Sequence, residues 1–178
     1  ACVQRWHEYT LTATKFIEGV SADVLPLTVP LCAGAGRLLA NFQAALRDFT
    51  PSSSERGGNF FVPDGDVLAP LQEAAASKAI LVDAEKLLTQ WIRAGDAFKA
   101  HANSLQSGWL HADFWPPNVV CQEGEVTALI DFDNCCYGAT LTDFAVGLLE
   151  FAMPRATALN RDTAEAFVGG YLIAGGNG

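Results

Sequence analysis

The chain has 178 residues, half of them hydrophobic, which is enough for one domain with a buried core but short for two complete domains. Eleven Lys and Arg against twenty Asp and Glu give a formal charge of −9 at pH 7, which argues against a nucleic-acid partner, because nucleic-acid-binding proteins gather basic residues on one face. The five cysteines form no C-x-x-C pair and no apolar stretch approaches the roughly 18 residues of a membrane span, so the composition predicts a reduced, cytoplasmic protein without a disulfide framework, a zinc site or a membrane partner.

The first half of the chain predicts one strand and two helices separated by a loop. Residues 9–17 alternate threonines with other residues and predict a strand that ends at Glu18-Gly19. From Leu31 to Phe49 the apolar residues recur at three- and four-residue steps, which predicts an amphipathic helix. Residues 50–66 are rich in proline, serine and glycine and predict a loop. A second helix is predicted from Asp83 to Ser104, with Asp83 as its N-cap.

The second half predicts short strands followed by two further helices. Three short apolar runs, broken by prolines and by Glu123-Gly124, predict strands, and the last two of them predict a hairpin that turns at this pair. Thr140, followed three residues later by Asp143, resembles a capping box at the start of the next helix. The predicted strands are Trp109-Leu110, Val119 to Cys121 and Val126 to Ile130, and the predicted helices run from Leu141 to Phe151 and from Thr163 to Ile173.

The residues suited to chemistry lie in one loop and at the end of the predicted hairpin. Phosphoryl transfer needs a carboxylate that orients the attacking hydroxyl and accepts its proton, and oxygen ligands that hold Mg²⁺ against a triphosphate. Asp113, Asn118 and Asp131 can supply that set. Asn118 begins one strand of the hairpin, and the other strand returns Asp131 to the same end, so we expect the three side chains to converge.

The pattern H-x-D-x-x-x-x-N from His111 to Asn118, followed by I-D-F at 130–132, resembles the catalytic loop of the aminoglycoside phosphotransferase and choline kinase family, relatives of the protein kinases. The resemblance implies an α+β fold, namely the mainly helical large lobe of a protein-kinase-like fold with a small catalytic β-hairpin. It implies Asp113 as the catalytic base, and Asn118 and Asp131 as the residues that bind magnesium and, through it, ATP. His111 would organise the loop and Asp143 would brace it.

Almost the whole chain is similar to the large lobe of this family. The segment F-I-E-G-V-S at 16–21 resembles the family's hinge, so residues 1–20 are predicted to be a remnant of the small lobe and hinge, and residues 21–178 the catalytic large lobe. The H-A-D form of the loop, this hinge and Gly170-Tyr171 look most like bacterial homoserine kinases. Residues 133–137 depart from the more apolar, aromatic segment expected there, and no Gly-rich loop or strand lysine with a glutamate partner precedes the hinge.

The resemblance predicts an ATP- and Mg²⁺-dependent enzyme that moves the terminal phosphate to a hydroxyl of a small molecule. The expected acceptors are homoserine, an aminoglycoside or an amino alcohol, all of which carry a cationic amine. The alternative is a truncated or inactive kinase-like lobe that serves as a fragment or an interaction module, because the small-lobe motifs are absent from the sequence.

Several further residues have two interpretations each. Asp133 either adds a carboxylate near the metal or is a solvated acid at a strand end. Trp115 either lines the substrate cleft or packs the loop. For Cys135-Cys136, core packing is favoured over redox chemistry. For Gly34-Ala35-Gly36, a position within a helix is favoured over a phosphate-binding loop.

Overall fold

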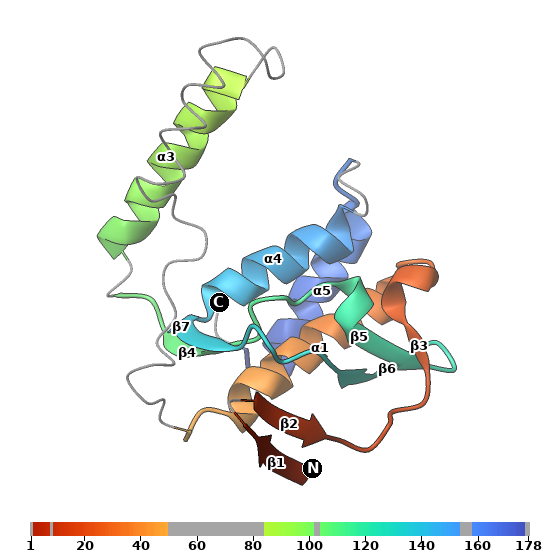
Figure 1. Ribbon diagram of the computed structural model, residues 1–178. Helices are drawn as coiled ribbons and strands as arrows, with labels where there is room; N and C mark the ends of the chain where they lie inside the picture. The colour runs from red at the N-terminus through yellow and green to blue at the C-terminus, as the bar shows by residue number, and fades with distance from the viewer. Residues whose placement is uncertain (1, 8, 50–83, 102–103, 154–157, 177–178) are drawn as a thin grey trace.

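The computed structural model describes residues 2–7, 9–49, 84–101, 104–153 and 158–176, in which helices pack beside small antiparallel sheets (Figure 1). This arrangement confirms the predicted α+β class. None of the helices in these ranges is long and apolar enough to cross a membrane. The loop predicted at 50–66 and the N-cap predicted at Asp83 lie outside the described residues. The helices are α1 (Val29–Ala45), α3 (Ala84–His101), α4 (Leu141–Ala152) and α5 (Arg161–Ile173), and the strands are β1 (Cys2–Trp6), β2 (Tyr9–Ala13), β3 (Val20–Ser21), β4 (Ser107–Leu110), β5 (Val119–Gln122), β6 (Glu125–Leu129) and β7 (Cys136–Ala139).

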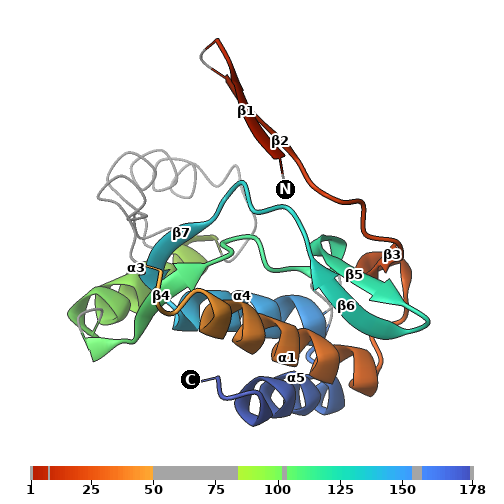
Figure 2. The same ribbon diagram turned by 90° about the horizontal axis from the view of Figure 1, so that it is seen from below.

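The core forms where α1 and α5 pack against each other, with α4 and the β5–β6 hairpin beside them (Figures 1 and 2). Glycines permit this close approach: a Cβ on Gly36 would lie 2.1 Å from the carbonyl oxygen of Phe167, and a Cβ on Gly170 would lie 2.0 Å from that of Ala33. The stretch Gly34-Ala35-Gly36 is therefore a buried part of α1, as the helical interpretation expected. The largest fully buried side chains of this core are Tyr171, Phe114, Phe151, Phe167 and Leu39.

The sheets are small and antiparallel. The order β3–β5–β6 contains the predicted hairpin, in which Val119 pairs with Leu129. Its turn has positive φ at Glu123 (52°) and Gly124 (84°), the conformation of a two-residue hairpin loop, so the prediction of this hairpin is confirmed. Strand β4 pairs with β7, and β1 pairs with β2 in a hairpin that projects away from the helices (Figure 2).

Two local predictions differ from the structure, namely the end of the first strand and the capping interaction of α4. The strand predicted over 9–17 ends at Ala13, and residues 14–18 form no regular element. The predicted capping box of α4 is wrong: Thr140 has helical backbone angles, and its hydroxyl donates to the carbonyl oxygen of Gln106 at 3.2 Å. Asp143 is instead bonded to the loop that follows β4.

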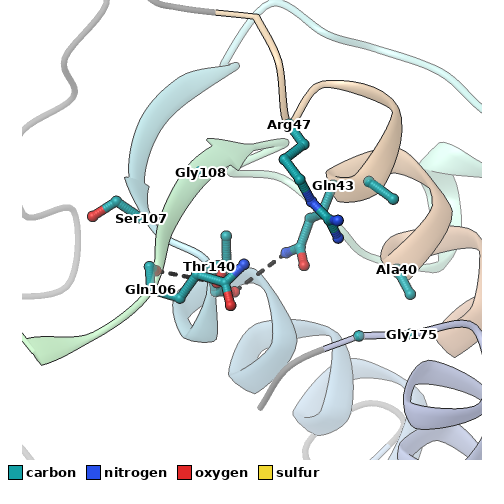
Figure 3. Close-up of a pocket in the computed structure, with 10 residues that line it drawn as sticks. Ala40, Gln43, Arg47, Gln106, Ser107, Gly108, Thr140 and Gly175 are labelled. Carbon is teal, nitrogen blue, oxygen red and sulfur yellow. Dashed lines mark hydrogen bonds between the residues drawn. The ribbon is translucent and has the colours of Figure 1, made fainter.

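A small pocket marks the place where α1, the start of β4, the start of α4 and the end of α5 meet (Figure 3). Gln43 links these elements, because its amide nitrogen donates to the carbonyl oxygen of Thr140 at 3.3 Å and its amide oxygen accepts from the Tyr171 hydroxyl at 2.7 Å. Arg47 points toward this pocket, whereas Asp113, Asn118 and Asp131 do not line it. The network fixes β4 and α4 relative to α1, and both of those elements hold the beginning of the loop described next.

Candidate active site

The candidate site is built on the loop from His111 to Asn118, which connects β4 to β5 and ends in a 3-10 turn, Pro116–Asn118. Beyond the last paired residues of the hairpin, the backbone N–H of Ile130 donates to the carbonyl oxygen of Asn118 at 3.0 Å. This bond extends the pairing by one step and places Asp131, the next residue, beside the end of the loop. The hairpin therefore brings Asn118 and Asp131 together although they are far apart along the chain.

Asn118 is the residue that fixes the loop internally. It is buried, and its amide nitrogen donates both to the carbonyl oxygen of Asp113 and to the Asp113 carboxylate, each at 2.9 Å. Its backbone N–H donates to the carbonyl oxygen of Trp115 at 3.0 Å. The positions of Asp113 and Trp115 are thus both set by Asn118, and the three predicted residues Asp113, Asn118 and Asp131 lie at one end of the hairpin.

Asp143 holds the beginning of the loop from the first turn of α4. Its carboxylate oxygens accept from the backbone N–H of His111 at 2.6 Å and of Ala112 at 3.0 Å. Ala112 has φ of 61°, a left-handed conformation that these bonds help to maintain. Burial raises the pKa of Asp143 above its ordinary value, whereas the two N–H donors act in the opposite direction because they favour the carboxylate.

His111 is fully buried and joins the loop to the strand end that precedes Asp131. Its Nε2 lies 2.9 Å from the carbonyl oxygen of Ile130, which can only accept, so Nε2 carries the proton. Its Nδ1 has no hydrogen-bond partner among the residues that the structure describes. The imidazole ring is surrounded by Phe42, Phe114 and Phe132, with centroids 5.3 to 6.4 Å away. This environment suits a structural role and leaves His111 no access to a substrate.

Asp131 is the most open of the candidate ligands. It is exposed, has φ of 63°, and accepts no hydrogen bond from the described residues. The amide nitrogen of Asn118 is engaged by Asp113, so the amide oxygen is the group that Asn118 has left for a cation. Carboxylate and amide oxygens are ligands that Mg²⁺ accepts, and Mg²⁺ usually takes only one or two of them from a protein beside substrate phosphates and water. The chemistry of this pair therefore fits a magnesium ion bound with a nucleotide.

The segment after Asp131 is acidic and carries a protonated thiol. Asp133 is exposed, and Cys135 is half-buried. Burial raises the pKa of Cys135 to about 12, with smaller upward contributions from Asp143, Cys136, Asp131 and Asp133. The four cysteines whose side chains are described are free, and Cys136 is buried in β7. The Cys135 thiol is therefore protonated at neutral pH, mainly because it is partly buried.

Ser21, in the predicted hinge, is a supporting residue that the sequence did not reveal. Its hydroxyl lies within hydrogen-bond distance of the carbonyl oxygens of Pro117 (3.0 Å) and Pro116 (3.4 Å) in the 3-10 turn. The strand β3, which contains Ser21, also pairs with β5, so that Val20 lies opposite Cys121. A contact between residues 96 positions apart has no signal in a single sequence.

Comparisons with a protein-family model, with related sequences and with solved structures all point to phosphotransferases. The model of a family described as the phosphotransferase enzyme family matches residues 5–176. A homoserine kinase of Beijerinckia indica is 31% identical over 157 residues, covering 88% of this chain and 46% of that protein. A homoserine kinase of Neisseria meningitidis is 36% identical over 77 residues, covering 43% of this chain and 25% of that protein. The chain thus spans less than half the length of these two curated relatives.

Two solved structures show the fold. The amicoumacin kinase hAmiN, solved in complex with AMP-PNP, Ca²⁺ and Ami, superposes with a TM-score of 0.61 at 15% identity, covering 90% of this chain and 48% of that one. An ethanolamine kinase of Plasmodium vivax superposes with a TM-score of 0.57 at 15% identity, covering 99% of this chain and 53% of that one. The chain therefore has a protein-kinase-like fold, and it spans about half of each of these kinases.

Proposed function

Because the chain belongs to the phosphotransferase enzyme family, we propose that it serves as the catalytic lobe of a kinase that transfers the terminal phosphate of ATP to a hydroxyl of a small molecule. The observation that carries the proposal is the clamp formed by Asn118, which fixes the Asp113 carboxylate beside the end of the hairpin where Asp131 lies. In the same proposal residues 21–178 form this lobe, and residues 1–20 belong to the hinge and a small lobe.

Asp113 is the proposed catalytic base. One of its carboxylate oxygens accepts a hydrogen bond from Asn118, which fixes the side chain and leaves the other oxygen for the substrate. The acceptor hydroxyl donates to that oxygen, and its own oxygen forms a bond to the terminal phosphorus while the bond from phosphorus to the ADP oxygen breaks. The hydroxyl proton passes to Asp113, so the charge that the attacking oxygen would otherwise develop is removed.

Asn118 and Asp131 are the proposed ligands of Mg²⁺, which would offset the charge of the triphosphate. The exposed carboxylate of Asp131 and the amide oxygen of Asn118 support this assignment. His111 and Asp143 are proposed as supports, since both hold the backbone of the loop and neither is accessible. A role for Asp133 as a further carboxylate near the metal has no support beyond its exposure, so Asp133 is left out of the ligand set.

Homoserine is the proposed acceptor, because two relatives at 31% and 36% identity are homoserine kinases. The test is product analysis by mass spectrometry after incubation with ATP, Mg²⁺ and either homoserine, ethanolamine or an aminoglycoside. Phosphorylated homoserine as the dominant product is the expected result, and Asp113→Asn should abolish it. Preferential phosphorylation of another acceptor would contradict the assignment of homoserine but not that of a kinase.

The alternative function, an interaction module without catalysis, predicts that the chain binds no nucleotide. Calorimetric titration of ATP with and without Mg²⁺ separates the two candidates. Magnesium-dependent binding supports the kinase. A chain that folds but binds no nucleotide with or without Mg²⁺ supports the module.

A further inference from the structure

The two tryptophans around the catalytic loop have contrasting environments. Trp109, in β4, is only 7% exposed, and its indole N–H donates to the carbonyl oxygen of Phe49 at 2.9 Å. Its ring also contacts Phe49 and Tyr137. Trp115 is 40% exposed, and its indole forms no hydrogen bond or ring contact with the described residues. Tryptophan buries the largest apolar surface of any side chain and usually finds a partner for its N–H, so an open indole is a costly feature for a loop to display.

The exposure of Trp115 follows from the backbone. Trp115 is extended, with φ −145° and ψ 166°, and successive side chains of an extended segment point to opposite sides. Its neighbours Phe114 and Pro116 are both buried. Phe114 is anchored by its ring contacts with Phe151 and Phe167 in the core. Trp115 therefore points away from the core because its neighbours point into it.

The backbone that carries the indole is held beside the proposed base. Asn118 donates its side-chain amide to the carbonyl oxygen of Asp113 and its backbone N–H to the carbonyl oxygen of Trp115. The ring of Pro117 restricts the turn that follows. Because Asn118 is bonded to both carbonyl groups, the backbone of Trp115 keeps its position relative to Asp113.

The electrostatic environment of the loop favours a cation. Asp113 is half-buried, Asp131 and Asp133 are exposed, and none of the three forms a salt bridge with a described residue. An indole face attracts an ammonium group by its quadrupole, and aromatic surface beside carboxylates is a combination that selects cationic amines over neutral alcohols.

We propose that Trp115 is a specificity-determining residue, whose indole packs against the ammonium group of the acceptor while Asp113 receives the acceptor's hydroxyl proton. This inference rests on the proposed kinase function. The expected acceptor is an amino alcohol or a hydroxy amino acid with a positively charged nitrogen. Trp115, which is neither the proposed base nor a proposed metal ligand, would select it.

Calorimetry with matched ligand pairs tests the role of Trp115 without requiring turnover. Wild type, Trp115→Phe and Trp115→Leu are titrated with homoserine, ethanolamine and choline, and with the isostere of each in which carbon replaces the ammonium nitrogen. Trp115→Leu should weaken binding of the ammonium ligands about two- to thirty-fold and that of the isosteres less than about two-fold. Trp115→Phe, which keeps an aromatic face, should restore most of the affinity. Trp91→Leu, a similarly exposed tryptophan (38%) on α3, should bind all ligands as wild type does.

The outcomes separate the inference from the function on which it rests. Equal losses for charged and neutral ligands, no loss in Trp115→Leu, or no ammonium ligand bound by wild type would overturn the role of Trp115. If magnesium-dependent ATP binding is present in that case, the kinase proposal stands alone. Absence of ATP binding contradicts the kinase proposal, whatever Trp115 does. Thermal unfolding of each variant checks that the loss is not one of folding, because more than half of the Trp115 surface is covered by the rest of the chain.

Discussion

The loop from His111 to Asn118 has little regular structure but is buried and hydrogen-bonded, whereas helix α3 is regular but largely exposed. The loop has one short 3-10 turn, yet His111 and Phe114 are completely buried and seven hydrogen bonds hold its backbone or side chains to Asp143, Ile130 or each other. Helix α3 has 18 residues of regular structure, yet Gly95 is the only buried residue among those of α3 whose burial is described.

This difference shows which region depends on tertiary contacts. A helix pairs its own backbone N–H and C=O groups, so α3 needs no other element to satisfy them, and it projects away from the other helices in Figure 1. An irregular loop has no internal ladder, so each N–H that is removed from water needs a specific partner. Substitutions should therefore have large effects in the loop and small effects on α3.

The largest expected effect is that of Phe114→Ala. Phe114 is 0% exposed and contacts three other rings, so removing it leaves a cavity under the loop. The expected loss is about 3 to 5 kcal/mol of unfolding free energy, measured by urea denaturation. Phe132→Ala is the matched control, because Phe132 is 50% exposed and should cost much less. Similar losses for the two variants would contradict the account of the loop's packing.

Asp143→Ala should have the next largest effect. It removes the acceptor of two buried backbone N–H groups, those of His111 and Ala112, and each unsatisfied group costs about 1 to 3 kcal/mol. We expect a loss of about 2 to 4 kcal/mol, with faster hydrogen exchange at these two amides. Asp133→Ala, an exposed carboxylate two residues after Asp131, should change stability by less than about 0.5 kcal/mol.

Burial of the Cys135 thiol, with smaller contributions from the nearby acids, predicts a loss of stability in alkali. The pKa of the Cys135 thiol is about 12 in the folded chain against 9.0 ordinarily, so the folded state holds this proton more tightly than the unfolded state does. The stability that depends on the protonated thiol is complete below pH 9 and is lost as the pH rises from 9 toward 12. Chemical denaturation across this range should show a steeper fall for wild type than for Cys135→Ala. Parallel profiles would show that Cys135 titrates normally.

Ala112→Gly should stabilise the chain, unlike the other substitutions in the loop. Ala112 has φ of 61°, which glycine adopts without strain, so the substitution should raise the free energy of unfolding by about 0.5 to 1 kcal/mol. Ala128→Gly in β6 is the control, because glycine in a strand interior should lower it by a similar amount. A loss of stability in both variants would mean that the backbone at Ala112 is not strained.

The smallest expected effect is on α3. Asp96 is exposed in the middle of the helix, and its side chain forms no hydrogen bond or salt bridge with the described residues. Asp96→Ala should change the unfolding free energy by no more than about 0.5 kcal/mol, with a slight gain from the higher helix propensity of alanine. A loss of more than about 1 kcal/mol would place α3 among the well-packed parts of the molecule and would remove the contrast with the loop.

The elements with a clear period were predictable from sequence, whereas the contacts that fix the loop were not. The β5–β6 hairpin, α4 and the encounter of Asn118 with Asp131 follow from alternation, turn residues and helical spacing. The two hydrogen bonds from the Asn118 amide to Asp113 depend on a 3-10 turn that residue spacing does not specify. The capping box at Thr140 failed because Asp143 bonds to a loop 31 and 32 residues away, and tertiary hydrogen bonds of this kind override local patterns.

Asp113 and Asp131 are proposed to serve different steps at one site, and calorimetric titration of ATP with Mg²⁺ into Asp113→Asn and Asp131→Asn separates the two roles. Asp113→Asn should bind ATP with wild-type dependence on Mg²⁺, because it changes only the proposed proton acceptor, whereas Asp131→Asn should lose that dependence. Equal affinity in both variants, with Mg²⁺ dependence unchanged, would show that Asp131 holds no metal.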